Sequence, residues 1–147
     1  MRSPKALEMD ADAWNLLADR SRLLVHYASQ LMAVLAQPAP QQDPLALGSI
    51  AGQATVALQT LLPAMLAAPE LAAHRRTIQR FDAALSDWRR SVTDASPLVA
   101  RYQTALLQQA AQVVTSGLHV AALSTSESAR VLVLRKDIGG GASPSPR

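Results

Sequence analysis

The sequence of 147 residues contains no cysteine. This absence excludes disulfide bonds, thiolate metal sites and cysteine nucleophiles, and it fits a reducing compartment, so we expect a cytoplasmic protein. Aromatic residues make up only 3% of the chain, so the 49% of hydrophobic residues are mostly Ala, Leu and Val. Ala and Leu are strong helix formers of modest volume, which predicts closely approaching helices that bury little area per residue. Self-association is one way for such a chain to gain stability.

Lysine is almost absent as well, because Lys5 and Lys136 are the only two and the other cations are arginines. The net charge is +3 and the pI is near 10.0. A positive charge carried almost entirely by arginine favours a solvated basic surface in a protein from an organism with a GC-rich genome. Nucleic acid is the less favoured partner. Aromatic residues do not alternate with the arginines, and the turn that precedes a DNA-recognition helix is missing.

The chain also lacks an uninterrupted apolar run long enough to span a membrane. The longest apolar stretch, at about residues 55–73, is broken by Pro63, Pro69 and Glu70, and falls short of the roughly 20 apolar residues that a spanning helix needs. Near the start, acidic Glu8 and Asp10 precede any apolar run, so the pattern of a secretion signal is missing. We expect neither a signal sequence nor a transmembrane segment.

No catalytic or metal-binding arrangement is visible in the sequence. None of His26, His74 and His119 has a second histidine three or four residues away, the spacing that places two ligands on one helix face. The G-x-S-x-G pattern of serine hydrolases is absent, and the glycine run at 139–141 precedes no helix that could help to hold a phosphate. We therefore expect a protein that is not an enzyme and that has no catalytic residues, no metal and no cofactor.

Two helices are predicted in the first half of the chain. The first begins with Asp10 or Asp12 as its N-cap and ends near residue 37, before two prolines. Asp43 and Pro44 open the second, since an Asp N-cap followed by proline at the first helical position is a strong start signal. Pro63 is expected to kink this helix or end it near residue 62.

Two further helices and a short last one are predicted in the second half. Pro69 opens a third helix that runs to about residues 93–95, and Ser96 with Pro97 opens a fourth. Gly117 weakens the fourth helix, and a capping-box pattern at residues 124–127 predicts a short last helix to about residue 136.

Together these signals predict an all-α fold. No segment alternates apolar and polar residues with a period of two over the length of a strand, so we expect no sheet. We expect an antiparallel helical bundle of about four helices, the last one broken, or an elongated pair of helical hairpins. Residues 1–138 form the single domain, and 139–147 are a flexible Gly/Ser/Pro tail. The spacing of Gly48 and Gly52 favours a close contact between soluble helices, with a dimer contact as the alternative.

The third helix carries an apolar stripe and a basic flank, and these are the predicted binding residues. The stripe consists of Leu71, Ile78, Phe81, Leu85, Trp88 and Val92, and the flank consists of Arg76, Arg80 and Arg90. The spacing of the stripe suits the buried side of a helix in a bundle, and it equally suits a surface that contacts a partner. From the sequence alone both interpretations stay open.

Part of this pattern resembles a known family. The run Asp43-Pro44-Leu45-Ala46-Leu47-Gly48, followed by Pro69, Leu71 and the Phe81, Leu85, Trp88 series, looks like the helical N-terminal region of bacterial polyhydroxyalkanoate synthases. The catalytic domain of those synthases has no counterpart here. In composition and pattern the chain is also similar to phasins, the helical coat proteins of polyester granules. The resemblance implies a protein that covers granule surfaces, often as an oligomer or with the synthase.

The leading hypothesis is therefore a non-enzymatic helical binding protein, phasin-like or associated with the synthase at polyhydroxyalkanoate granule surfaces. Its expected partner is a hydrophobic polymer surface or the helices of another protein, because amphipathic helices can lie on an apolar surface with their polar sides outward. The first alternative is a cytoplasmic adaptor or chaperone-like oligomer. The second is a basic, nucleic-acid-associated helical protein.

Overall fold

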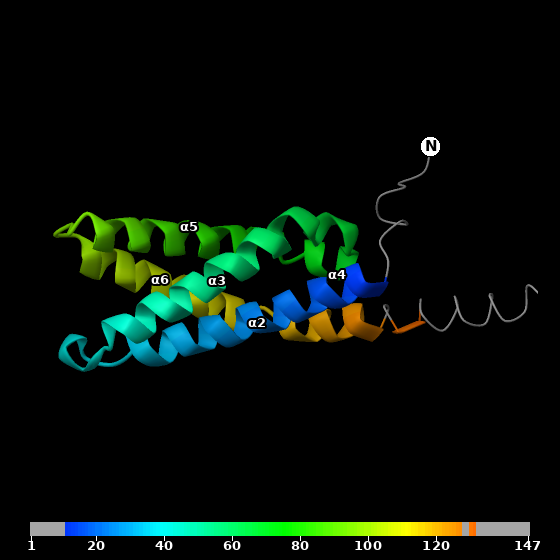
Figure 1. Cartoon of the computed structure of the whole chain (residues 1–147), viewed down its shortest axis with the longest axis horizontal. Coiled ribbons are helices and arrows are strands. Elements are labelled where there is room, and N and C mark those ends of the chain that lie inside the picture. Colours follow the sequence, from blue (N-terminus) through cyan, green and yellow to red (C-terminus); the bar gives the residue numbers. More distant parts are fainter. Residues whose placement is uncertain (1–10, 128–129, 132–147) are drawn as a thin grey trace, which may run out of the picture.

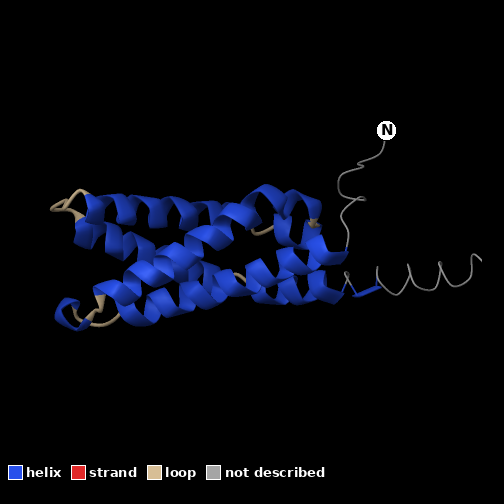
Figure 2. Cartoon of the chain, in the orientation of Figure 1, coloured by secondary structure: helices blue, strands red, loops and turns tan. Residues whose placement is uncertain are grey.

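The computed structural model describes residues 11–127 and 130–131, and within these ranges it contains helices and turns but no strand (Figure 2). The protein is all-α, as predicted. Of the sequence predictions, the N-cap role of Asp10, the end of the last helix near residue 136 and the tail at 139–147 lie outside the described residues. The α-helices are α2 (Ala11–Leu35), α3 (Pro44–Ala64), α4 (Pro69–Ala72), α5 (Arg75–Thr93) and α6 (Val99–Thr115), with 3-10 turns η1 (Ala39–Gln41) and η2 (Met65–Ala67).

Helix α2 begins one residue before the predicted N-cap Asp12, which lies inside the first helical turn. There its carboxylate is close to the positive end of the helix dipole. The helix ends at Leu35, where the side chain of Gln42 donates through Nε2 to the carbonyl of Gln37 at 2.9 Å. This contact helps to close the link to the next helix.

Helix α3 starts as predicted. The Oδ1 atom of Asp43 accepts from the backbone N–H of Leu45 at 3.0 Å, and Pro44 occupies the first helical position. Pro63 was predicted to kink this helix or end it near residue 62; the α-helix passes through Pro63, ends at Ala64 and then tightens into η2. Pro63 and Gln59 are both exposed, so water can bind the carbonyl that the proline leaves without a donor.

The third predicted helix is divided into α4 and α5 at Ala73 and His74. The N–H of His74 donates to Leu71 at 2.9 Å, and its carbonyl accepts from Ile78 at 3.1 Å, so this residue both closes one helix and begins the next. Neither glycine nor proline marks the break. The prediction of one continuous helix from Pro69 was therefore wrong, and local sequence gives no reason for the division.

Helix α6 and the helix after it are separated at Gly117, as predicted. This glycine has a φ of +84°, a left-handed conformation that side chains disfavour. The chain becomes helical again at residue 118 and not at the predicted capping box, which lies inside the helical stretch 118–127. The Oγ atom of Ser116 accepts from the N–H of Leu118 at 3.2 Å and supplies the cap that the sequence analysis assigned to Ser124.

Four long helices pack in a cycle, because α2 contacts α3 and α6, and α5 contacts α3 and α6. Figure 1 shows them running lengthwise beside one another, with α4 at the turn between α3 and α5. One continuous apolar core joins all of them. Its largest fully buried side chains are Leu17, Leu24, Leu31, Leu58, Leu61, Met65, Leu71, Ile78, Phe81, Leu85, Leu106 and Leu118.

Candidate functional site

The predicted apolar stripe belongs to the core of the protein. Leu71, Ile78, Phe81 and Leu85 are almost completely buried, and Trp88 is only 5% exposed. In the folded chain these side chains are enclosed by the protein itself, so they do not form an exposed contact stripe. Val92 departs from the stripe because it is 50% exposed next to the end of α5.

The predicted basic flank lies on the outside of α5. Arg76, Arg80 and Arg90 are exposed, and Arg90 lies 3.7 Å from the carboxylate of Asp87. Arg89 has a different role, because its Nη1 donates to Oγ1 of Thr55 on α3 at 2.7 Å. The outer side of α5 is therefore a charged, solvated surface from which one arginine reaches the neighbouring helix.

Asp82 is a partly buried carboxylate on α5. Partial burial raises its pKa above the ordinary value of 3.8, because desolvation disfavours the charged form. No ion pair involving Asp82 occurs among the described residues. Although five arginines share this helix, the ion pair on α5 in the described part of the chain joins Arg90 to Asp87.

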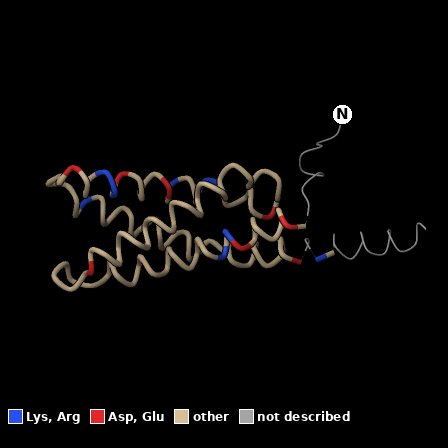
Figure 3. Tube along the Cα trace, in the orientation of Figure 1, with Lys and Arg blue, Asp and Glu red and all other residues tan. Residues whose placement is uncertain are grey.

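Helix α3 has a neutral surface. No ionisable residue occurs between Asp43 and Glu70, and Figure 3 shows α3 free of charged positions while α5 carries both signs. Three large apolar side chains on α3 and η2 face solvent: Leu45 is 85% exposed, Val56 57% and Leu66 67%. Leu45 and Val56 are 11 residues apart, which is about three helical turns, so they lie on one side of α3, and Leu66 follows in η2. We call these three residues the α3 outer face.

The segment Pro44–Ala67 is also long and apolar enough to cross a membrane, judged by length and composition alone. Of its most apolar window, 33% is buried in the folded chain. This is weak evidence for a membrane span, because the core helix of a soluble protein passes the same test of length and composition.

The two glycines of α3 do not serve the packing contact that we predicted from their spacing. A side-chain Cβ atom added at Gly48 or Gly52 would have no non-local neighbour within 4 Å. The expectation of a close helix contact within this chain is therefore wrong. Instead the glycines leave open space, one helical turn apart, beside the α3 outer face.

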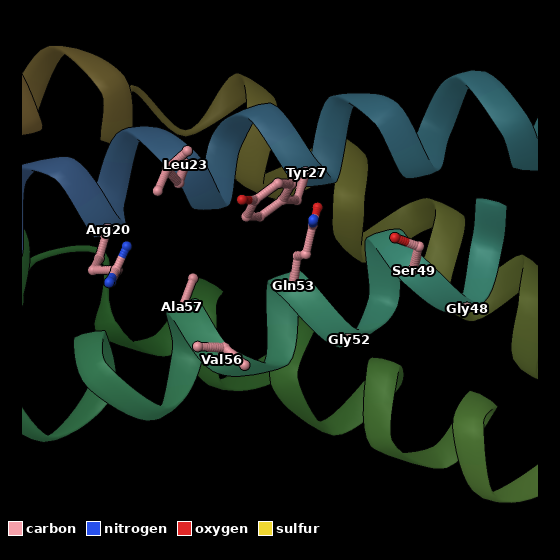
Figure 4. Close-up of a pocket in the computed structure, with 9 residues that line it drawn as sticks. All are labelled: Arg20, Leu23, Tyr27, Gly48, Ser49, Gly52, Gln53, Val56 and Ala57. Carbon is pink, nitrogen blue, oxygen red and sulfur yellow. The ribbon is translucent and has the colours of Figure 1, made fainter. Parts of the chain in front are cut away.

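This space forms a groove between α2 and α3, with a volume of about 490 Å³. Figure 4 shows its walls: Arg20 reaches from α2 toward Ala57 on α3, and Tyr27 and Gln53 extend toward each other farther along. We call it the α2–α3 groove. Its complete lining is Arg20, Leu23, Tyr27, Gly48, Ser49, Gly52, Gln53, Val56 and Ala57.

A smaller cavity of about 250 Å³ lies where Trp88 and Val92 meet the beginning of α3 and of α6. The Nε1 atom of Trp88 is buried there without a hydrogen-bond partner. Beside it, Gln103 donates through Nε2 to Oε1 of Gln42 at 2.9 Å, which joins α6 to the link between α2 and α3. Val92 thus borders a hollow, which explains why the regular stripe of α5 is not fully covered at this end.

The three histidines lie on different elements. His26 is exposed on α2 with its ring 5.7 Å from that of Tyr27, His74 separates α4 from α5, and His119 is exposed beyond Gly117. Within residues 11–127 and 130–131, no three His, Asp or Glu side chains gather in a way that could hold a metal ion. The α2–α3 groove, the cavity at Trp88 and the neutral face of α3 are therefore the candidate sites in the described part of the chain.

Comparison with protein-family models, with curated proteins and with solved structures found no match to this chain. The resemblance to phasins and to the synthase N-terminal region therefore stays a hypothesis based on sequence pattern. The α3 outer face and the α2–α3 groove are the features of the molecule that bear on its function.

The sequence analysis missed the α3 outer face and the groove. A usable signal was present, because the absence of ionisable residues from 44 to 69 is visible in the sequence. A search for apolar stripes finds the side of a helix that packs inward, and the α3 outer face has only three large apolar residues, widely spaced. Arg20 gave no signal at all, since a single arginine on a helix is usually solvated.

Proposed function

We propose that this protein is a non-enzymatic, phasin-like helical binding protein that attaches to the surface of polyhydroxyalkanoate granules through the α3 outer face. The observation that carries the proposal is the neutral stretch from Pro44 to Pro69, on which Leu45, Val56 and Leu66 are exposed. We further propose that the helices form an antiparallel bundle, broken at Gly117, and that the protein is cytoplasmic. In this proposal α3 lies on an apolar surface and does not cross a membrane.

The energetic argument concerns desolvation. Burying a Leu or Val side chain that is otherwise exposed contributes about 1.5–3 kcal/mol, so three partly exposed residues together favour adsorption by several kcal/mol. No charged group on α3 has to lose its water in the process, and charge burial is the cost that usually prevents adsorption. The arginines of α5 can stay in water. The contact thus differs from the stripe predicted on α5, whose use would require the core to open.

The test is localisation in cells that make polyester granules. A fluorescently tagged full-length chain is expected on the granules, and Leu45→Asp with Leu66→Asp should move most of it to the soluble fraction. Leu123→Asp is the matched control, because Leu123 is 51% exposed on a different helix. Circular dichroism should show that all variants remain folded. A wild-type chain that stays away from granules would contradict the proposal, and so would equal release by the control.

An alternative is an adaptor whose α3 receives a helix of another protein. The observation that favours it is the open space at Gly48 and Gly52, since small residues one turn apart let two helices approach closely. Gly52→Leu distinguishes the two functions. It should prevent a partner helix from docking but leave adsorption to a polymer surface unchanged, because Leu adds apolar area. Co-purification with a helical partner in granule-free cells is the corresponding measurement.

A further inference from the structure

Arg20 is a partly buried cation for which the described part of the chain provides no acceptor. Its Nε atom is shielded from water and has no hydrogen-bond partner. The residues one turn before and after it on α2 are leucines, at positions 16, 17, 23 and 24. Across the groove, α3 has no carboxylate at all. A guanidinium N–H that lacks both water and an acceptor is unfavourable, so this site is incomplete.

The space beside Arg20 has the dimensions of a small-molecule site. The α2–α3 groove is about 490 Å³, within the range of roughly 300–1,000 Å³ typical of ligand pockets. Leu23 and Val56 contribute apolar surface on the side of Arg20, Tyr27 and Gln53 extend toward each other farther along, and Gly52 and Gly48 lie beyond them at the end away from Arg20 (Figure 4). From Arg20 to Tyr27 the groove follows seven residues of α2, which is about 10 Å.

We propose that the α2–α3 groove binds a small amphiphile that carries one carboxylate and an apolar chain. The chain has about eight carbons, which extend over the roughly 10 Å between Arg20 and Tyr27. The carboxylate pairs with the Arg20 guanidinium, and the chain passes Ala57 and Val56 and ends beside Tyr27 and Gly52. Charge complementarity carries the assignment, because among the described residues Arg20 is the only charged side chain that lines the groove. Arginine pairs with carboxylates through two parallel N–H donors, which also fixes the direction of the ligand.

This inference does not depend on granule binding, and its test uses the full-length chain in solution. Isothermal titration with sodium octanoate should show saturable binding to the wild type, and methyl octanoate, which keeps the chain and loses the charge, should bind much more weakly. Arg20→Gln should weaken octanoate binding by about tenfold to a hundredfold, as expected for losing a charged hydrogen bond. Arg80→Gln is the matched control, because it removes the same charge from an exposed position on α5 and should change the affinity less than twofold.

A second pair of variants tests where the apolar chain of the ligand lies, and leaves the charge of Arg20 unchanged. Gly52→Leu fills the groove and should abolish binding, while Gln59→Leu adds the same side chain at an exposed position of α3 and should not. In two-dimensional amide spectra of the unaltered protein, octanoate should shift the signals of Gly52, Val56 and Ala57 far more than those of α5. The proposal is overturned if the wild type does not bind octanoate, if Arg20→Gln and Arg80→Gln lose affinity equally, or if the spectral shifts are spread evenly over exposed leucines.

Discussion

Helices α3 and α5 are of similar length and touch each other, yet their surfaces differ in kind. Helix α5 carries five arginines and two aspartates, and its buried residues include Ile78, Phe81, Leu85 and Trp88. Helix α3 has no charge and leaves large apolar side chains in water. The comparison shows that strong amphipathicity marks a helix whose apolar side already has a partner inside the protein. On α3, whose pattern is weaker, Leu45 and Val56 are left exposed, whereas on α5 Val92 is the large apolar side chain left exposed.

The largest expected effect separates the core side of α5 from the outer face of α3. Phe81→Ala removes a fully buried ring and should lower the free energy of unfolding by about 3–5 kcal/mol. Leu66→Ala, at an exposed position, should change it by less than about 0.5 kcal/mol. Urea denaturation followed by circular dichroism measures both. Similar losses for the two variants would show that the α3 outer face is covered in the folded protein.

The glycines provide the next test, because alanine is expected to raise the free energy of unfolding at Gly48 and Gly52 and to lower it at Gly117. Gly48→Ala and Gly52→Ala should each raise the free energy of unfolding by about 0.5–1 kcal/mol, because alanine favours helix and the added methyl group has room. Gly117→Ala should instead lower it by about 1–2 kcal/mol, because this residue has a positive φ. Thermal and urea unfolding provide the comparison. Destabilisation by alanine at residues 48 and 52 would mean that the groove is occupied within the folded chain.

A smaller effect is expected for the contact that joins the two helices. The hydrogen bond from Arg89 to Thr55 lies at an exposed position, and such a bond contributes about 0.5–1 kcal/mol. A double-mutant cycle with Arg89→Met and Thr55→Val should give a coupling energy of this size, and a cycle with Arg80→Met and Thr55→Val should give none. A coupling energy near zero in the first cycle would show that α3 and α5 are held together by apolar packing alone.

The smallest expected effect concerns how the free energy of unfolding depends on pH through Asp82 on α5. Since burial raises the pKa of Asp82 in the folded state, the folded protein keeps this proton at pH values where the unfolded chain has lost it. Stability therefore falls as the pH rises from the ordinary 3.8 through the raised folded-state pKa. Asp82→Asn removes this dependence, so the variant should be slightly more stable than the wild type above that interval.

Urea midpoints at pH values from about 3 to about 7 measure this difference. Asp87→Asn serves as control, because it removes a carboxylate that pairs with Arg90 on the exposed side of the same helix. It should produce no gain at neutral pH. A gain that persists at the acidic end for Asp82→Asn would contradict the assigned role of burial.

Much of the fold followed from local signals in the sequence. Asp43 with Pro44 marks the beginning of α3 because the required atoms are adjacent in the chain, and Gly117 marks a break because only glycine tolerates that backbone conformation easily. The buried part of the α5 stripe followed from its period. Each of these features depends on residues within one or two turns of each other.

The features that could not be predicted depend on tertiary surroundings. The break at His74 has no glycine or proline, and Pro63 is accommodated because its side of α3 faces water. Val92 has the right spacing for burial, but it borders a cavity at the end of α5. The partial burial of Arg20 arises from the groove between two helices. Spacing along one helix cannot report which neighbouring element, if any, covers a given side.

The uniform neutrality of α3 also has a colloidal consequence. Copies of this protein carry a net charge of +3 and repel one another, but α3 contributes no charge to oppose a collision. That repulsion is screened beyond roughly 8 Å at physiological salt, and it disappears near the pI of about 10.0. Solubility should therefore decline with added salt and with alkaline pH, and the first contacts between molecules should form at α3.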